Sequence, residues 1–184
     1  NIMPNPYLDY PGDYNLNKIE IITATGEVLP LRMGMIVELN VFEDIESSAL
    51  TGSMVMIDSS NIISNAPLQG NERLVFKLST PVSEYDERVA IDASEETGYP
   101  FHIYAIKKRV IQSETLSSYN IQFCSRELLR NTRTRVSRAY EGEVHQAAIK
   151  ILRDKNGLDS KKRLRYEPTK NKEKLVIPNM RPFR

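Results

Sequence analysis

The sequence contains little of the material from which disulfide-stapled domains and metal centres are built. It has one cysteine, Cys124, two histidines, His102 and His145, and no tryptophan. A single cysteine cannot form an internal disulfide, and one thiol with two distant imidazoles lacks the spacing of a structural zinc site. Apolar runs extend over only a few residues, far short of the roughly 20 that cross a bilayer. These absences exclude stapled mini-proteins and zinc fingers, and we expect no stable membrane binding.

Groupings typical of catalysis are also scarce. The sequence has no nucleophile motif of the form G-x-S-x-G and no glycine-rich phosphate loop, since Gly34 and Gly52 stand alone. Cys124 has no obvious base beside it, and each histidine has the setting of an ordinary surface imidazole. Adjacent carboxylates lack the EF-hand spacing and indicate solvated rims: Glu43 with Asp44, Asp86 with Glu87, and Glu95 with Glu96. We predict a protein that is not an enzyme, with no catalytic, cofactor-binding or metal-binding residues.

Charge is present in quantity and is unevenly distributed. The 184 residues are 40% hydrophobic, enough for a real core, and their formal net charge is only +1. Residues 1–105 nevertheless hold 5 Lys and Arg against 16 Asp and Glu, whereas residues 106–184 hold 20 against 8. Two oppositely charged halves indicate either that the halves attract each other or that each faces a different partner.

The first two thirds of the chain have the pattern of an antiparallel β structure. Residues 1–17 are rich in Pro and Asn and predict an extended arm. Residues 18–125 predict six or seven strands joined by short turns, with one short helical turn for which the run Asp58-Ser-Ser-Asn offers capping groups. An acidic loop is expected at 83–99. The predicted strands span residues 19–23, 35–42, 50–57, 72–80, 89–91, 101–111 and 118–123. Such a run predicts an antiparallel β-barrel or a sandwich.

Residues 126–184 predict the start of an α+β domain. After a short helix at 126–131, an apolar stripe with helical spacing predicts a helix over about 142–156; its members are Val144, Ala147, Ala148, Ile151 and Leu152. Residues 163–167 and 174–177 have the pattern of a small hairpin. One helix and one hairpin are too little to bury a core, so we expect only part of a second domain here.

A run of arginines is the strongest candidate functional site. It consists of Arg126, Arg130, Arg133, Arg135 and Arg138. One interpretation is a nucleic-acid-binding module that uses the basic segment 126–165. The other is a subunit interface, in which guanidinium groups bind carboxylates such as those of the acidic first half. We favour the interface, because the i, i+4 spacing of Arg126 and Arg130 and the alternation of Arg133 with Arg135 suit fixed pairing.

Five segments, in order, resemble one family. They are LTGSMVMIDSSNII at 50–63, GNERL at 70–74, RELLRN at 126–131, RVSRAYEG at 135–142 and IPNMRPF at 177–183. In this order the sequence resembles the N-terminal part of baseplate hub proteins from T-even-like contractile-tailed bacteriophages, of the marine and cyanobacterial myophage type. None of the segments is a mechanistic signature by itself, so the resemblance depends on their order.

The resemblance implies a virion structural protein. It implies a tail-tube-like β-barrel, a homotrimeric ring that joins the tail tube to the central spike, and a channel through which DNA passes. The partners it implies are the spike protein, tail-tube or tube-initiator proteins and, transiently, DNA. The implied location is the phage tail baseplate, assembled in the host cytoplasm. Relatives of this type are longer and complete a second barrel, so we expect this chain to be part of such a subunit.

Overall fold

The computed structural model describes residues 14–183, apart from 46, 48, 66–67, 80–89, 98 and 114–115. The chain divides into two compact units. Unit 1 consists of Asn1–Val41 and Thr51–Phe123, and unit 2 of Phe42–Leu50 and Cys124–Arg184. Most of the predicted arm lies outside the described residues, as do residues 83–89 and 98 of the predicted acidic loop. The described end of the arm, from Asn15, already belongs to the first strand.

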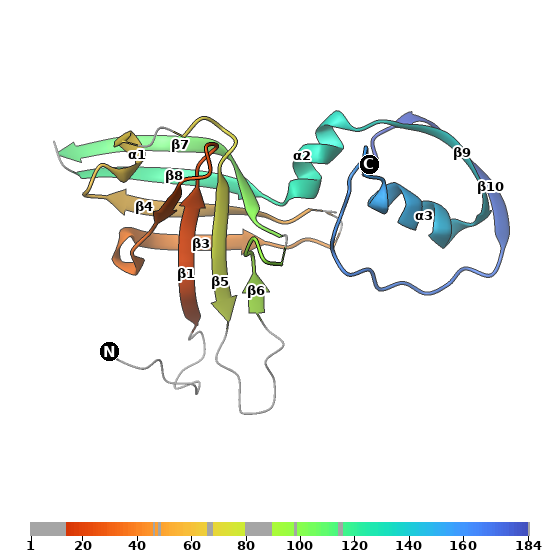
Figure 1. Ribbon diagram of the computed structural model, residues 1–184, viewed down its shortest axis with the longest axis horizontal. Helices are drawn as coiled ribbons and strands as arrows, with labels where there is room; N and C mark the ends of the chain where they lie inside the picture. Colours follow the sequence, from red (N-terminus) through yellow and green to blue (C-terminus); the bar gives the residue numbers. More distant parts are fainter. Residues whose placement is uncertain are drawn as a thin grey trace, which may run out of the picture. The chain divides into compact units, whose positions relative to one another are not determined.

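Unit 1 is built on one eight-stranded sheet (Figure 1). Its strands follow the order β2-β1-β5-β7-β8-β4-β3, and β6 pairs with β5 off this path. A 3-10 turn, η1 (Met33–Met35), and a short helix, α1 (Ile62–Asn65), connect strands. The strands are β1 (Asn15–Ile22), β2 (Val28–Pro30), β3 (Ile36–Phe42), β4 (Thr51–Asp58), β5 (Arg73–Ser79), β6 (Ala90–Asp92), β7 (Phe101–Ser113) and β8 (Leu116–Cys124). The prediction of a mainly antiparallel β chain is confirmed.

The sheet folds over on itself. In Figure 1 the part that contains β1, β5 and β6 crosses the part that contains β3, β4, β7 and β8. The path of pairings begins at β2 and ends at β3, and no pairing among the described residues joins these two strands. Burial alternates along the whole of β4 and along β8 as far as Phe123, as expected for strands with one face on a core.

Three aromatic rings form the centre of the unit 1 core. Phe76, Phe101 and Phe123 come from neighbouring strands, and their ring centroids are 5.0–6.1 Å apart in one stacked and two edge-on pairs. Gly52 on β4 lies directly against the Phe123 ring and the Asn40 carbonyl, where a Cβ would overlap both. Packing therefore requires glycine at position 52, because a side chain there would collide with these groups.

Two buried carboxylates fix the loops of unit 1. Asp58 accepts hydrogen bonds from the backbone N–H groups of Ser60 and Ile63, each at 3.0 Å, which confirms the predicted cap of the helical turn. Glu72 accepts from the N–H groups of Gln69, at 2.5 Å, and Gly70, at 2.8 Å. Each carboxylate satisfies backbone donors that a tight turn leaves without a partner.

Unit 2 contains α2 (Arg126–Arg133), β9 (Val136–Glu143), α3 (Val144–Arg153) and β10 (Lys172–Met180). β9 and β10 form a two-stranded antiparallel sheet, in which Tyr140 faces Leu175, and α3 packs beside it (Figure 1). At the end of the chain Asn131 and the backbone of Phe183 exchange two hydrogen bonds, of 2.9 and 3.2 Å. This exchange holds the end of unit 2 against α2.

Two details of unit 2 differ from prediction. The partner of β10 is β9, and residues 163–167 form no strand. A period-two pattern marks a strand but does not select its partner; here the Tyr140–Leu175 face is the one that α3 covers. The helix spans Val144–Arg153, shorter than 142–156, because residues 141–143 pair in the sheet with Lys172–Lys174.

Candidate functional site

The arginine run begins on α2, which carries its first three members, Arg126, Arg130 and Arg133. Ser125 occupies the N-cap position with extended backbone, but its side chain makes no capping bond. Glu127 lies in the first turn and Arg130 and Arg133 in the last, the arrangement that a helix dipole favours. Arg126 and Arg130 are one turn apart, so their side chains emerge on the same face.

Arg126 is bound within its own unit. Its guanidinium forms an ion pair with Asp159 at 3.0 Å and also donates to the Asp159 carbonyl at 3.3 Å. The hydrogen bond from Arg126 lowers the pKa of Asp159, and Lys161, at 3.4 Å, assists. One side chain thus fixes both the backbone and the carboxylate of the segment after α3.

Arg130 and Arg153 hold the same segment through its carbonyl groups. Arg130 donates to the carbonyls of Gly157 at 2.6 Å and Lys155 at 2.7 Å. Arg153 donates to the carbonyls of Ser160 and Lys162, the latter at 2.7 Å. Each guanidinium spans two acceptors with the N–H groups of its rigid planar fork, whereas a lysine ammonium offers its donors from a single nitrogen. We call Arg126, Arg130, Arg153 and the segment 155–162 the arginine clasp.

A buried carboxylate completes the arginine clasp. Glu127 is only 6% exposed, accepts a hydrogen bond from the Ser160 hydroxyl at 2.8 Å, and has the Lys162 ammonium 3.5 Å away. A buried charge is costly unless it is paired in this way. Glu127 therefore fastens the far end of the segment to the first turn of α2.

The remaining predicted interface arginines lie elsewhere. All three are exposed: Arg133 ends α2, Arg135 immediately precedes β9, and Arg138 lies on β9. Among the described residues they form no ion pair. The five arginines of the prediction thus fall into two sets: Arg126 and Arg130 are engaged inside unit 2, whereas the other three face solvent.

The sequence offered little to predict the partners of the clasp. Asp159 and Ser160 lie in an irregular segment without period, and Arg153 falls near the end of the predicted helix 142–156, where its spacing indicates no partner. Their pairing is set by how the chain returns past α2, which local pattern does not encode. The nearest signal is the arginine spacing itself, which indicated fixed pairing without identifying the acceptors.

Cys124 and His145, the other residues considered for chemistry, have surroundings typical of structural residues. Cys124 is buried, and desolvation raises the pKa of its thiol to about 11. The His145 ring stacks on Tyr166 at 5.4 Å, with its Nδ1 3.1 Å from the Thr169 N–H and its Nε2 3.4 Å from Glu143. Within the described residues no three side chains are grouped as a metal site requires, and no helix is long and apolar enough to span a membrane.

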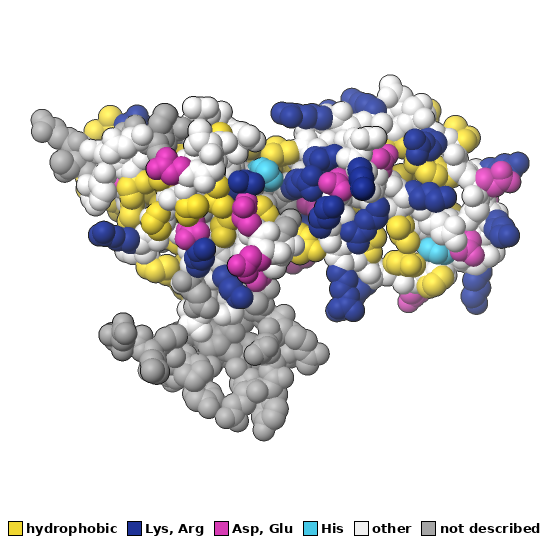
Figure 2. Space-filling model, viewed as in Figure 1, with side chains coloured by type: hydrophobic (Ala, Val, Ile, Leu, Met, Phe, Trp, Pro, Cys, Tyr) yellow, Lys and Arg dark blue, Asp and Glu magenta, His cyan; other side chains and the backbone are white. Residues whose placement is uncertain are grey.

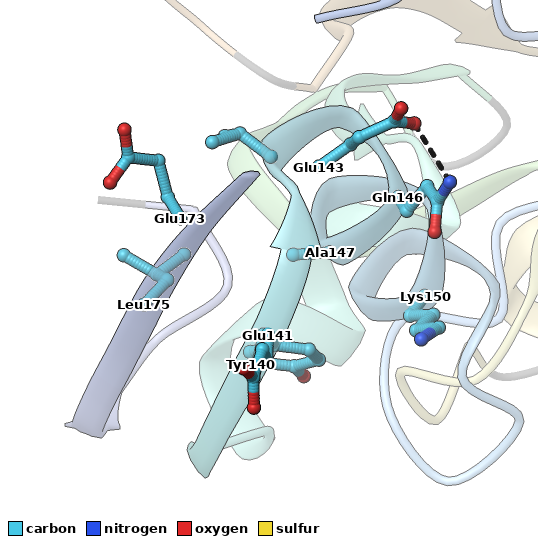
Figure 3. A pocket seen from close by; sticks show the side chains of 10 residues that line it. Tyr140, Glu141, Glu143, Gln146, Ala147, Lys150, Glu173 and Leu175 are labelled. Atoms are coloured by element: carbon cyan, nitrogen blue, oxygen red, sulfur yellow. Dashed lines mark hydrogen bonds between the residues drawn. The ribbon is translucent and has the colours of Figure 1, made fainter. Parts of the chain in front are cut away.

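A small hollow lies between α3 and the β9–β10 sheet, with a cavity volume of about 10 Å³ (Figure 3). Its lining includes Tyr140, Ala147 and Leu175. The Glu143 carboxylate accepts from the Gln146 amide at 2.8 Å and points away from Glu173 in Figure 3. Since the carboxylates do not converge, the hollow lacks the arrangement of a cation site or of paired acid–base groups.

Among known proteins, solved structures provide the likenesses to this chain. No protein-family model matches the chain, and no curated protein matches it. Five chains of solved structures match. One is an E. coli protein described as a component of the type VI secretion system with structural similarity to the T4 bacteriophage tail proteins gp27 and gp5. The TM-score is 0.43 at 14% sequence identity, covering 93% of this chain and 40% of that one.

Proposed function

We propose that this chain is a structural subunit of a phage-type contractile tail, a baseplate hub protein that works by assembly. In this proposal three copies form a ring that joins the tail tube to the central spike and surrounds the DNA channel. Its partners are the spike protein and the tail-tube or tube-initiator proteins, and its location is the virion baseplate. DNA passes through the ring without being bound stably.

One observation carries the proposal: the segments that resemble hub proteins coincide with the parts that hold each unit together. Segment 50–63 supplies β4, Gly52 and the Asp58 cap, and segment 70–74 supplies Glu72. Segment 126–131 carries Arg126, Glu127, Arg130 and Asn131, and segment 177–183 ends on Phe183. Because these residues maintain the fold, the resemblance supports a subunit that contributes its folded shape to a ring.

Exposed guanidinium groups support an interface role for part of the arginine run. We assign the intersubunit role to Arg133, Arg135 and Arg138, which are free to bind carboxylates of a neighbour. Arg126 and Arg130 serve the interface indirectly, by fixing the surface from the inside.

Electron microscopy of the full chain with its spike and tube partners tests the proposal. The expected result is a ring with a central channel between tube and spike. Reversing Arg135 to Glu is expected to reduce incorporation into particles while the variant melts at the same temperature as the parent. A chain that binds neither spike nor tube under any condition would contradict the proposal.

A second function, nucleic-acid binding, is favoured by one observation. Dark blue Lys and Arg side chains gather over unit 2 in Figure 2. Five exposed arginines there form no ion pair within the described residues: Arg133, Arg135, Arg138, Arg163 and Arg165. Binding of this kind predicts a steep salt dependence, with a log–log slope of about 0.9 for each phosphate neutralised. Filter binding with duplex DNA at low salt decides this, and the absence of affinity would exclude the module.

A further inference from the structure

A long connection joins α3 to β10 in unit 2. Residues 154–171 contain no helix or strand, and connections longer than about 15 residues without secondary structure are uncommon unless they are functional or disordered. This connection is fixed at several points. The arginine clasp holds its first part, and further along Thr169 donates its backbone N–H to His145 Nδ1 at 3.1 Å. An ordered loop of this length is of the kind that forms binding surfaces.

Residues 163–168 of this connection, which we call the tethered segment, are held between two anchors. On one side the Lys162 carbonyl accepts a hydrogen bond from Arg153 at 2.7 Å. Towards the other, the Tyr166 ring stacks on His145 with 5.4 Å between ring centroids. No backbone group of the tethered segment forms a hydrogen bond within the described part of the chain. A short segment held at both ends loses little conformational entropy when a partner binds it.

The tethered segment has the pattern of a strand that lacks a partner. Exposed Arg163 and Arg165 alternate with half-buried Leu164, as residues on the two faces of a strand do. The same period in the sequence predicts a strand at 163–167, where the structure has none. Pairing with a second strand satisfies both the free backbone groups and this alternation.

Among the strands at the ends of the two sheets, β3 is the one suited to pair with a basic strand. β2 has three residues and finishes on Pro30, and β10 contains Pro178 and two lysines. β9 carries Arg138. β3 has seven residues, no proline, lysine or arginine, and Glu38 as its only charged residue. Val37 on β3 is 61% exposed, and natural proteins usually cover or protect a long end strand of this kind.

We propose that β3 of one copy pairs with the tethered segment of the next copy. This inference rests on the proposed function, because it specifies how the subunits of the ring join. The contact connects unit 1 of one copy with unit 2 of the next, so it brings unlike units together. It is heterologous, and successive copies close into a ring or continue as a filament according to the rotation between them.

The side chains of the two strands select an antiparallel register. When Glu38 lies opposite Arg165, Leu39 lies opposite Leu164, so unlike charges share one face of the pair and apolar side chains share the other. In this direction Pro168, which has no N–H to donate, falls just outside β3. In the parallel direction with the same charge pair, Pro168 falls within β3 and removes a hydrogen bond from the ladder.

Backbone hydrogen bonds provide the affinity of such a contact, and charge determines its specificity. Arg163 and Arg165 form no ion pair within the described residues, so both are available to Glu38 of a neighbour. Two adjacent cations on one face also repel a second basic strand. The tethered segment therefore selects β3 by attraction and excludes another tethered segment by repulsion.

Mixed cysteine variants test the contact directly. Asn40 lies opposite Arg163 in the proposed register, so full-length Asn40→Cys is mixed with full-length Arg163→Cys and oxidised mildly at high protein concentration. A covalent dimer is expected from the mixture, whereas each variant alone is expected to stay monomeric on a denaturing gel. Native Cys124 is buried, and the raised pKa of its thiol, about 11, keeps it unreactive.

A second mixture tests the register. Glu167→Cys places the thiol four residues from position 163, roughly 13 Å along a strand, whereas a disulfide requires Cα atoms within about 7 Å. Its mixture with Asn40→Cys is expected to form no dimer.

Three results would overturn the proposal. One is the absence of dimers from Asn40→Cys with Arg163→Cys although both variants melt at the parental temperature. Another is a dimer from either variant alone, which shows pairing of like strands. The third is a double variant that forms an internal disulfide and stays monomeric, which shows that the contact lies within one copy.

Charge exchange supplies a second readout. By sedimentation, Glu38→Arg and Arg165→Glu are each expected to weaken self-association about fivefold or more, since like charges then face each other. The two variants mixed as one double variant are expected to recover most of the loss. Glu27→Arg and Lys150→Glu, at exposed positions outside the two strands, are the controls and are expected to leave association unchanged. Failure of the double variant to recover would contradict the contact.

The outcomes also separate this inference from the two functions proposed above. If particles contain the chain as a ring but the cysteine mixture does not cross-link, the pairing is wrong and the hub role stands. If copies cross-link but bind neither spike nor tube, the pairing stands and the hub role is wrong. If Arg165→Glu abolishes filter binding of duplex DNA and the mixture does not cross-link, the tethered segment serves nucleic acid and the pairing is wrong.

Discussion

Single atoms decide the packing of unit 1 at Gly52. The Phe123 ring occupies the space where any other residue would place its Cβ, and the Asn40 carbonyl lies on the other side. Phe123 in turn contacts Phe76 and Phe101, so a displacement at this point is transmitted to the whole aromatic centre. Close-packed interiors have no free volume to absorb it.

Gly52→Ala is therefore expected to destabilise the protein by about 1–3 kcal/mol, the usual cost of overpacking. Chemical denaturation followed by far-ultraviolet circular dichroism measures the change. Gly34→Ala is the matched control, because nothing lies within 4 Å of the position where its Cβ would be. Equal stability of the two variants would contradict the packing described.

Asp159 makes the stability of unit 2 depend on pH in the acidic range. Its pKa lies below the ordinary value of 3.8, first because of the Arg126 hydrogen bond, so the unfolded chain takes up a proton at higher pH than the folded one. The stabilisation is complete above the unfolded pKa and is lost as pH falls through the folded pKa. Asp159→Asn is expected to flatten stability against pH below about 4.

Thermal melting between pH 2.5 and 6 checks this expectation. Glu167→Gln is the control, because Glu167 is exposed and has no ion pair within the described residues. A variant at Asp159 that keeps the parental pH profile would show that the ion pair contributes nothing to stability.

At the scale of elements, unit 2 is held together largely by the hydrogen bonds of the arginine clasp. Unit 2 buries few large apolar side chains among its described residues; Leu158 is the most completely enclosed. The irregular segment 155–162 is held to α2 and α3 by guanidinium groups that bind its carbonyls. A short helix and a two-stranded sheet are marginal alone, so these bonds contribute a large share of the local stability.

Arg130→Lys is expected to keep the positive charge but to lose the paired hydrogen bonds to the two carbonyls. An ammonium cannot reach both the Gly157 and the Lys155 carbonyls in the geometry of the guanidinium, and the expected loss is about 1–2 kcal/mol. Limited trypsin digestion should then cleave several times faster at Lys161, Lys162 or Arg163. Arg138→Lys, on the exposed face of β9, is expected to digest like the parent. Equal digestion of both variants would count against the clasp.

At the scale of the whole molecule, the charge division does not follow the domain division. The sign of the charge changes between residues 105 and 106, and this boundary falls inside β7. Unit 1 therefore contains an acidic sheet with one basic outer edge, rather than being acidic throughout. The two halves seen in the sequence do not correspond to two bodies, and opposite charges occur on different edges of one sheet.

The two units are expected to unfold in separate steps. Each has its own interior, an aromatic core in unit 1 and the clasp in unit 2. Calorimetry should resolve two transitions, and Gly52→Ala should lower one while Arg130→Lys lowers the other. A single transition that both variants lower equally would contradict the independence of the units.

Several local features could be predicted from the sequence with accuracy. The alternation along residues 35–42 and 118–123 corresponds to β3 and β8, the Asp58 cap is in place, and the apolar stripe from Val144 lies on a helix. Each depends on contacts within a few residues. The predicted partner of β10, residues 163–167, was wrong, because the strand with which β10 pairs lies about 35 positions away in the sequence. The acceptors of Arg126 and Arg130 could not be predicted for the same reason.

The sequence by itself determined where most of the unit 1 strands and the main helix of unit 2 form, and that the chain is mainly antiparallel β, since side-chain periodicity and backbone preference are local properties. Only the tertiary structure decided the rest. It decided which arginines are used inside unit 2, which strands lie at the ends of the unit 1 sheet, and that the change of charge falls inside one strand. These outcomes depend on which groups lose their contact with water, and that is set by neighbours distant in the chain.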